Sequence, residues 1–275
     1  MNKVDKLFFE ACSEVMNEGQ STLEQKVRPV YSDGVPAHTK YITHVCETYD
    51  ISKGEFPITT LRPVPWKNGI KEILWIYQDQ TTDLSVLKEK YNIHWWDSWE
   101  YENSGSIGEC YGYIVKKYDL INKLLDGLKN NPLDRGHIIN LWQYMHLDNG
   151  GLRPCAFMTT WNVRGEYLDL CLHQRSSDYL VAGHINKIQY VALLMMVAKS
   201  VGLTPGKFTH FIDNLHIYDR HFEQAKEMLN RKPSEKQPRL ILDTDKTDFY
   251  SFTIDDFKME DYEPVRPQLS FDLGI

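Results

Sequence analysis

An apolar segment between residues 186 and 200 constrains the fold more than any other part of the chain. Gly202 follows it at a position where glycine commonly ends a helix. A membrane-spanning helix needs about 18 or more apolar residues, whereas this segment is shorter and has polar residues on both sides. We therefore predict a helix of a globular protein here, with apolar side chains at Ile188, Val191, Leu194, Met195 and Ala198.

The other periodic segments predict helices and strands that do not alternate strictly. Apolar residues at helical spacing indicate helices at residues 2–18, 70–77, 84–91, 117–129 and 218–229. Strands are predicted at residues 40–48, 156–162 and 166–174, the last two joined as a hairpin, with strand and turn at 240–252. This order favours an α+β fold. No repeat or Gly/Ser linker divides the sequence, so we predict one domain over residues 1–275.

Charge and cysteine usage exclude several classes of protein. Lys and Arg number 31 against 38 Asp and Glu, a net charge of −7 that disfavours binding to duplex nucleic acid. The five cysteines form no CxxC pair and no cluster at zinc-ligand spacing, so we expect reduced thiols and no metal. Residues 1–20 lack the pattern of a signal peptide. We expect a cytoplasmic protein that binds no membrane.

Cys155 is a candidate nucleophile. It follows Pro154 where an irregular loop enters the predicted hairpin, and Arg175 lies just beyond the end of that hairpin. Because a hairpin brings its two ends together, Arg175 is expected beside the thiol, where its charge would favour the thiolate. The competing interpretation is that Cys155 is a small core residue like the other four cysteines.

Four further groups carry polar chemistry, each with a structural alternative. Residues 174–178 offer arginine and serine donors for a phosphate, or form a solvated strand end. His216 and Tyr218 share one face if extended and could bind a sugar hydroxyl, or are satisfied polar groups. Glu72 lies in an apolar segment where burial would raise its pKa, or is a helix charge with one wet edge. The tryptophans at 95, 96 and 99 could stack on a flat ligand or fill the core.

Taken in order, these residues resemble the thymidylate synthase family nearly end to end. The resemblance rests on Arg135, Pro154-Cys155, Gln174-Arg175-Ser176, Asp178, Asn186, His216-x-Tyr218, and the segments at residues 70–75, 96–99, 111–112 and 249–257. It implies a large mixed β-sheet with flanking helices and a homodimer formed through that sheet. The substrates it implies are dUMP and 5,10-methylenetetrahydrofolate.

The resemblance also implies a role for each matching residue. Cys155 would add to C6 of dUMP, with Glu72, Tyr111 and Asn186 assisting catalysis. The dUMP molecule would be bound by Arg28, Arg135 (acting on the other subunit), Arg175, Ser176, Asn186, His216 and Tyr218. Folate would contact Trp96, Asp178 and the C-terminal Ile275.

Some positions depart from the family pattern and leave alternatives open. Gly136 replaces a second phosphate arginine, Leu61 a common lysine, and Ala182 a glycine near the folate, while Ala156 follows the nucleophile. Because of these features and residues 213–222, a related reaction stays open as the alternative: hydroxymethylation of dUMP, with water in place of hydride. A catalytically reduced nucleotide- or RNA-binding relative is the third possibility. Asn186 argues for uracil over cytosine, because an amide presents both a donor and an acceptor.

Overall fold

A mixed β-sheet lies at the centre of the structure, a computed structural model that describes residues 1–275. The strands follow the order β1-β2-β7-β5-β4-β3, with β6 beside β7; β5 and β6 run parallel to β7, and the other pairs are antiparallel. Their bounds are β1 Gln20–Ser21, β2 Thr39–Asp50, β3 Ile138–Asn140, β4 Ala156–Arg164, β5 Tyr167–Gln174, β6 Ser177–Asp178 and β7 Thr204–Tyr218. A separate pair joins β8 Arg239–Leu242 to β9 Phe257–Glu260.

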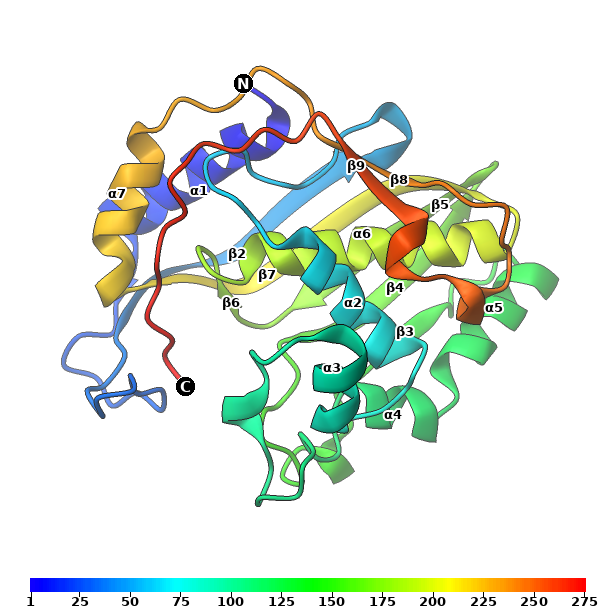
Figure 1. The fold of residues 1–275 in the computed structure, drawn as a ribbon, viewed down its shortest axis with the longest axis horizontal. Helices are drawn as coiled ribbons and strands as arrows, with labels where there is room; N and C mark the ends of the chain where they lie inside the picture. Colours follow the sequence, from blue (N-terminus) through cyan, green and yellow to red (C-terminus); the bar gives the residue numbers. More distant parts are fainter.

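Helices cover one face of this sheet (Figure 1). The apolar helix α6 packs on β5 and β7, and α2 packs on α6. The helices are α1 Lys3–Glu18, α2 Trp66–Tyr77, α3 Leu84–Tyr91, α4 Gly112–Lys117, α5 Leu120–Asn130, α6 Gly183–Ser200 and α7 Phe222–Asn230. Short 3-10 helices lie at Ile51–Lys53, Asp97–Trp99, Tyr144–His146, Asp219–His221, Phe249–Ser251 and Ile254–Asp256. None of the helices is long and apolar enough to span a membrane.

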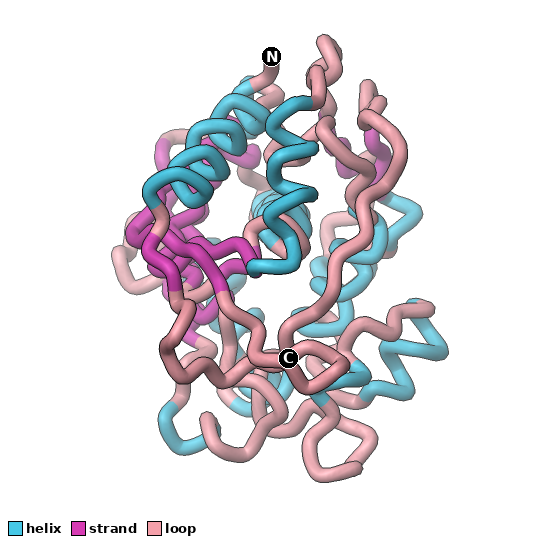
Figure 2. The backbone as a smooth tube through the Cα atoms, turned by 90° about the vertical axis from the view of Figure 1, so that its left-hand side faces the viewer, coloured by secondary structure: helices cyan, strands magenta, loops and turns pink.

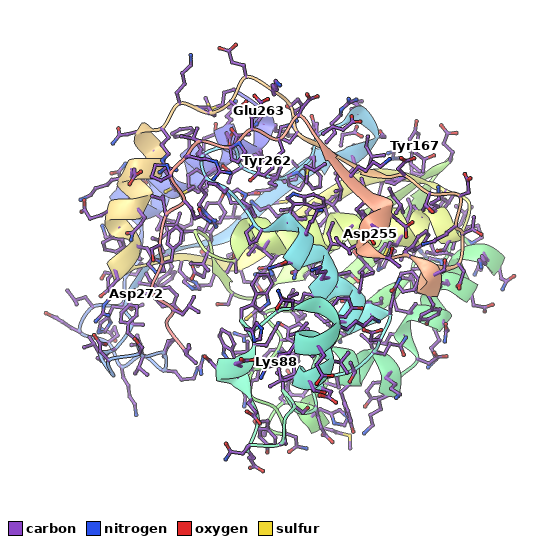
Figure 3. All side chains as sticks on the ribbon, viewed as in Figure 1. Lys88, Tyr167, Asp255, Tyr262, Glu263 and Asp272 are labelled. Carbon is purple, nitrogen blue, oxygen red and sulfur yellow. The ribbon has the colours of Figure 1, made fainter.

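The two faces of the sheet differ in burial. On β5 the side chains of Leu168, Leu170 and Leu172 point into the core beneath α6, as their alternation predicted. Side chains of the opposite face, such as His173 and Phe211, stay half-buried. We call this second side of β4, β5 and β7 the open face. The strands of the central sheet lie along one side of the molecule in Figure 2. Acidic residues such as Asp255, Glu263 and Asp272 are exposed (Figure 3).

Most predicted elements are confirmed, with boundary shifts. Helices α1 and α3 lie where expected, whereas α2 begins at Trp66 and α6 at Gly183, four and three residues earlier than predicted. The N-cap of α3 is Asp83, whose side chain accepts from the Ser85 N–H. The hairpin is tighter than predicted: Arg164 pairs with Tyr167, which leaves Gly165 and Glu166 as the turn, and Gly165 has φ +63°.

Two predicted helices are wrong in extent. The helix predicted at residues 117–129 is α5, which begins three residues later, at Leu120, because Asp119 takes a left-handed conformation (φ +53°) before it; α4, which ends at Lys117, was not predicted. The helix predicted from residue 218 begins at Phe222 instead, because Tyr218 is the last residue of β7 and a 3-10 turn follows it. Strand β7 itself was not predicted beyond a possible extended conformation at residues 214–218. Its inward side chains include His210, which interrupts the apolar alternation.

Candidate functional site

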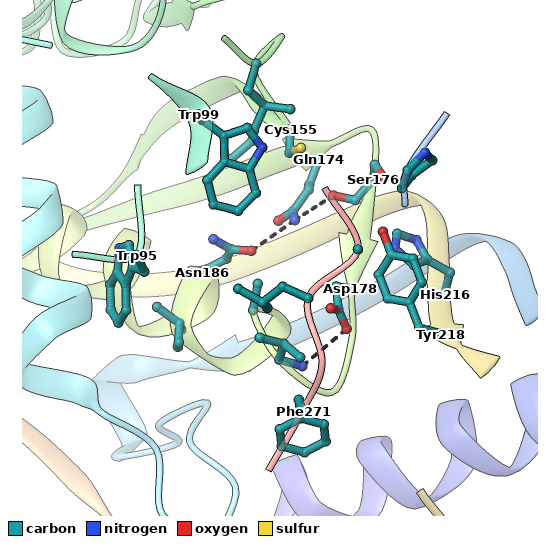
Figure 4. Close-up of a pocket in the computed structure, with 18 of the residues that line it drawn as sticks. Trp95, Trp99, Cys155, Gln174, Ser176, Asp178, Asn186, His216, Tyr218 and Phe271 are labelled. Carbon is teal, nitrogen blue, oxygen red and sulfur yellow. Dashed lines mark hydrogen bonds between the residues drawn. The ribbon is translucent and has the colours of Figure 1, made fainter. Parts of the chain in front are cut away.

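A cavity of about 640 Å³ opens where the central strands end beside α2 and α6. We call the strand ends the strand wall; it carries Cys155, Arg175, Ser176, Asp178, His216 and Tyr218. We call α2, α6 and the indoles that follow α3 the helix wall; it carries Glu72, Trp95, Trp96, Trp99, Asn186 and Gln189. Figure 4 shows both walls, with the C-terminal segment crossing in front. The cavity therefore gathers nearly all the residues that the sequence singled out.

Cys155 lies directly before β4, beside Arg175, as predicted from the hairpin. A guanidinium nitrogen of Arg175 is 3.6 Å from the Cys155 Sγ, and the Arg175 N–H donates to the Cys155 carbonyl at 2.9 Å. The guanidinium is fixed by the carbonyls of Pro154 and Arg153, at 2.9 and 2.7 Å. The Arg153 side chain turns away and pairs with Asp148. Arg175 is thus the cation that the backbone holds against the thiol.

The pKa of the Cys155 thiol differs from the sequence-based expectation. Burial raises it above its usual value, and the positive charges of Arg175 and Arg28 oppose this effect without overcoming it. The expectation that neighbouring cations would lower the pKa considered only one of the two opposing effects. In the free protein the sulfur is therefore mainly a thiol at neutral pH. Burial similarly raises the pKa of Cys12 and Cys110 to about 12, but those thiols face no cation.

Tyr111 reaches the nucleophile from the beginning of α4. Its hydroxyl accepts a hydrogen bond from the Cys155 backbone N–H at 3.0 Å. Tyr111 has φ +41°, a region that side chains rarely adopt. The next residue, Gly112, packs so closely that a Cβ would lie 2.2 Å from the Thr81 carbonyl oxygen. Only glycine fits there, and this contact fixes where Tyr111 points.

The end of β7 brings His216 and Tyr218 together, as their spacing predicted. Their rings meet edge to face with centroids 5.2 Å apart, and the Asn214 side chain is 3.0 Å from His216 Nδ1. Burial lowers the pKa of His216 to about 4, so the ring is neutral at physiological pH. Neutral imidazole and phenol groups suit the recognition of hydroxyl groups.

On the helix wall, Glu72 lies on α2 and is only 7% exposed. Burial raises the pKa of its carboxyl, and a hydrogen bond from Trp95 Nε1 partly opposes the rise. Facing it on α6, Asn186 accepts from Gln174 Nε2 and donates to Gln189 Oε1, both at 3.0 Å. The sequence-based expectation of a buried, proton-exchanging carboxyl at Glu72 is consistent with this environment.

A second carboxyl, the half-buried Asp178, lies further along the cavity. Burial raises the pKa of Asp178 to about 6, although the Val181 N–H donates to it at 3.3 Å. Beside it, Arg62 is 3% exposed and lies over the Phe271 ring, 5.2 Å from the centroid. Leu61, where a lysine was expected, is fully buried, so the cation of this part of the cavity is Arg62. A flat apolar surface, a carboxyl and a cation thus lie side by side.

Two predicted residues lie outside the lining of this cavity. Arg135 is exposed just before β3, with Gly136 beside it. Ile275 pairs with Val30 through two backbone hydrogen bonds of 2.8 and 2.9 Å, which ties the C-terminus to the loop that carries Arg28. Leu273 and Gly274 form the rim instead. No group of three or more His, Cys, Asp or Glu side chains in the structure could hold a metal ion.

Sequence reasoning missed Arg62, Gln189 and Phe271. Arg62 follows directly after Leu61, the position where a lysine was expected, so the cation would have been found one position further along the sequence. Gln189 is a polar residue inside the apolar segment at 186–200, and that interruption was the available signal. Phe271 lies in a segment without periodic pattern, where nothing in the sequence indicates which residues fold back over a cavity.

Comparison with known proteins identifies relatives over the whole chain. A family model described as thymidylate synthase matches residues 6–275. Thymidylate synthases of Streptococcus suis (strain 05ZYH33) and Streptococcus pneumoniae (strain 70585) are 56% and 54% identical, with full coverage of both chains. The solved structure of thermostable thymidylate synthase A from Bacillus subtilis superimposes with a TM-score of 0.92 at 36% identity, covering 98% of this chain and 99% of that one.

Proposed function

Because the chain belongs to the thymidylate synthase family, we propose that it converts dUMP to dTMP with 5,10-methylenetetrahydrofolate through a covalent bond to Cys155. The chain is thus a methyltransferase that acts in dTMP biosynthesis, with residues 1–275 as one catalytic domain. The observation that carries the residue assignment is the thiol of Cys155 on the cavity wall, with a guanidinium nitrogen 3.6 Å from the sulfur. The relatives favour this reaction over hydroxymethylation of dUMP.

In the proposed reaction, the Cys155 sulfur loses its proton and bonds to C6 of dUMP. The electron pair of the C5–C6 double bond then makes C5 a nucleophile. The folate supplies the one-carbon unit and, afterwards, the hydride that reduces it to a methyl group. Tyr111 assists loss of the C5 proton, Glu72 organises water for proton transfer, and the C6–S bond breaks to release dTMP.

The strand wall is suited to the phosphate and the sugar of dUMP. Arg175 and Ser176 would hold the phosphate, with Arg28 covering it from its loop, because guanidinium groups match phosphate oxygens. His216 and Tyr218 would bind the 3′-hydroxyl. These assignments need the neutral His216 ring that burial produces.

Asn186 would read the base. Its amide can accept from N3–H of uracil and donate to O4, which a cytosine ring cannot match. The Gln174 and Gln189 side chains leave one lone pair of the oxygen and one N–H of the nitrogen free for this purpose. Asn186 therefore selects a uracil nucleotide.

The folate fits the part of the cavity between Trp96 and Phe271. Trp96 would line one side of the flat pterin, and Asp178 would accept hydrogen bonds from it. Arg62 would meet the acidic tail of the folate, in place of the lysine expected at residue 61. The C-terminal residues up to Ile275 would cover the ligand, since they already cross the cavity mouth (Figure 4).

We also propose a homodimer formed through the open face. Phe157, on β4, packs edge to face with Trp142 (6.1 Å between ring centroids), which in turn meets the 83%-exposed Tyr144 (6.4 Å). A half-buried apolar face of this kind is suited to an identical partner. Arg135, exposed in this chain, would then reach the phosphate bound by the partner. The compartment we propose is the cytoplasm, which would keep all five cysteines reduced.

The test is incubation of the protein with dUMP and methylenetetrahydrofolate. The expected result is formation of dTMP together with dihydrofolate, which is measured by the rise in dihydrofolate absorbance. Hydroxymethyl-dUMP with tetrahydrofolate would instead identify the related hydroxymethylation, and no product would contradict both reactions.

The dimer has its own test. Arg135→Glu and Cys155→Ala should each be inactive alone, because each disables both sites of its own dimer. Mixing and refolding them together should restore up to about a quarter of wild-type activity, since mixed dimers hold one intact site. Continued inactivity of the mixture, with mixed dimers present by mass spectrometry, would contradict the shared site.

A further inference from the structure

Three side-chain amides form one hydrogen-bonded row behind the cavity, and the row ends at Gln189, to which the proposed reaction assigns no role. Gln174 Nε2 donates to Asn186 Oδ1, and Asn186 Nδ2 donates to Gln189 Oε1, each at 3.0 Å. Gln189 lines the cavity and is only 3% exposed, yet its Nε2 has no hydrogen-bond partner. A buried N–H donor without a partner costs free energy, so such a group calls for a functional explanation.

The direction of the row is fixed at its beginning. Gln174 Nε2 also donates to the Ser176 carbonyl at 2.9 Å, and a carbonyl can only accept. Gln174 Oε1 lies 2.8 Å from His210 Nε2, and burial lowers the pKa of His210 to about 3, so the ring is neutral. Because an amide oxygen can only accept, the proton of this ring is on Nε2, which donates to Gln174. Reversing any one of the amides would place two donors or two acceptors against each other. Gln189 Nε2 must therefore point away from Asn186.

The free donor of Gln189 faces Glu72. Helix α2, which carries Glu72, packs on α6, which carries Gln189. Burial raises the pKa of Glu72, and the donors of Gln189, Trp95 and Trp96 that face the carboxyl oppose this rise. The other titratable groups near this carboxyl are Tyr111 and Tyr190, and both are neutral because burial raises their pKa values well above the usual range. Gln189 therefore lies between the base-reading amide and the only carboxyl on the helix wall.

We propose that Gln189 is a positioning residue that couples recognition of the pyrimidine by Asn186 to proton transfer by Glu72. Asn186 sets the orientation of Gln189, and Gln189 Nε2 in turn holds the Glu72 carboxylate in its working position. A base that displaces Asn186 would also displace the carboxyl. This role rests on the proposed function, because it assumes that Asn186 reads uracil and that Glu72 exchanges protons.

The test removes the amide donor of Gln189 and keeps the volume of its side chain. Gln189→Met should raise the pKa of Glu72, measured by infrared or carboxyl NMR titration of the ligand-free protein with Glu72→Gln for assignment. We expect a shift of roughly 0.5 to 1 pH unit, and the limb of the kcat profile that depends on Glu72 should move to higher pH by the same amount. The kcat value should fall on the order of tenfold, while the Kd for dUMP stays within about twofold.

A second variant and a control complete the experiment. Gln189→Glu adds a carboxyl beside Glu72 and should move the titration further than methionine does, because two like charges cannot both be ionised easily. Gln20→Met makes the same chemical change at an exposed residue that bonds only the Ser21 carbonyl, and should change nothing. Retained dUMP binding shows that the variants are folded.

The outcomes separate the two proposals. An unchanged Glu72 titration in both Gln189 variants overturns the positioning role, even if the wild-type protein makes dTMP. A wild-type protein that binds dUMP but forms no dTMP overturns the proposed function, and the coupling with it. A pKa of Glu72 that rises from the wild type to Gln189→Met and again to Gln189→Glu supports the coupling. A purely structural residue would not order the pKa values by the charge at residue 189.

Discussion

The strand wall and the helix wall face the same cavity but are held in place in different ways. On the strand wall, Arg175 is fixed by backbone carbonyls of the loop before Cys155. On the helix wall, Asn186 is held by other side chains, and Glu72 lies opposite it on a separate helix. The difference indicates that the strand wall can keep its geometry when a side chain changes, whereas one change on the helix wall displaces its neighbours.

The largest effect is expected on the strand wall. Cys155→Ala should lower kcat by at least about 10⁴-fold, because no bond to C6 can form. dUMP binding, measured by calorimetry, should persist, since the backbone-held Arg175 does not need the sulfur. Cys12→Ala, at a buried thiol away from the cavity, should remain active. Substantial turnover without Cys155 would remove the nucleophile from its role.

Arg175→Leu should weaken dUMP binding by about 100-fold, because charge-assisted bonds to the phosphate are lost. It should also raise the pKa of the Cys155 thiol, since the positive charge of Arg175 opposes the effect of burial. The pH dependence of Cys155 alkylation measures this second change, and the rate curve should move to higher pH. A curve that does not move would show that the guanidinium has no electrostatic effect on the sulfur.

On the helix wall, Asn186→Asp should shift the kcat/KM ratio toward dCMP over dUMP by about ten- to a hundredfold. The aspartate carboxyl can accept a hydrogen bond from the 4-amino group of cytosine. In the wild-type protein the Asn186 amide oxygen is held by Gln174 and does not face that amino group. The same variant should change the titration of Glu72, because it breaks the amide row. Selectivity that stays with dUMP would contradict the assignment of base reading to Asn186.

The smallest effect concerns Asp178, the half-buried carboxyl of the strand wall. Its pKa is about 6 in the folded chain against an ordinary value of 3.8, so the folded state binds this proton more tightly. The stability from this group is complete below pH 3.8 and is lost as the pH rises through about 6. Asp178→Asn should remove that decline, so the melting temperatures of variant and wild type should diverge by a few degrees between pH 4 and pH 7. Parallel melting curves would contradict the raised pKa.

The strand wall was largely predictable from the sequence. The alternation of Leu168, Leu170 and Leu172 gave the hairpin, and the hairpin placed Arg175 beside Cys155. What local pattern could not give was the thiol pKa, because burial depends on helices far away in the sequence. The end of β7 was anticipated only at residues 214–218, since His210 interrupts its alternation for a reason that lies on β5, at Gln174.

On the helix wall, Glu72 and the tryptophans were singled out by local pattern, but their meeting with Asn186 was predictable only through the resemblance to a family. The residues Glu72 and Asn186 are 114 positions apart by their numbers, and only the packing of α2 on α6 brings them together. Gln189 and Arg62 were missed because their importance comes from this packing and not from any motif. The start of α5 was placed three residues too early because the left-handed Asp119 does not interrupt the helical pattern of the sequence.

The indole cluster offers a built-in optical reporter. Three of the seven tryptophans, Trp95, Trp96 and Trp99, line the cavity, and Trp142 stacks against Arg175. Their emission depends on how wet and how polar their surroundings are, and a bound nucleotide or pterin alters both. Intrinsic fluorescence should therefore follow occupancy of either wall directly, without attached dyes that would compete for the five thiols.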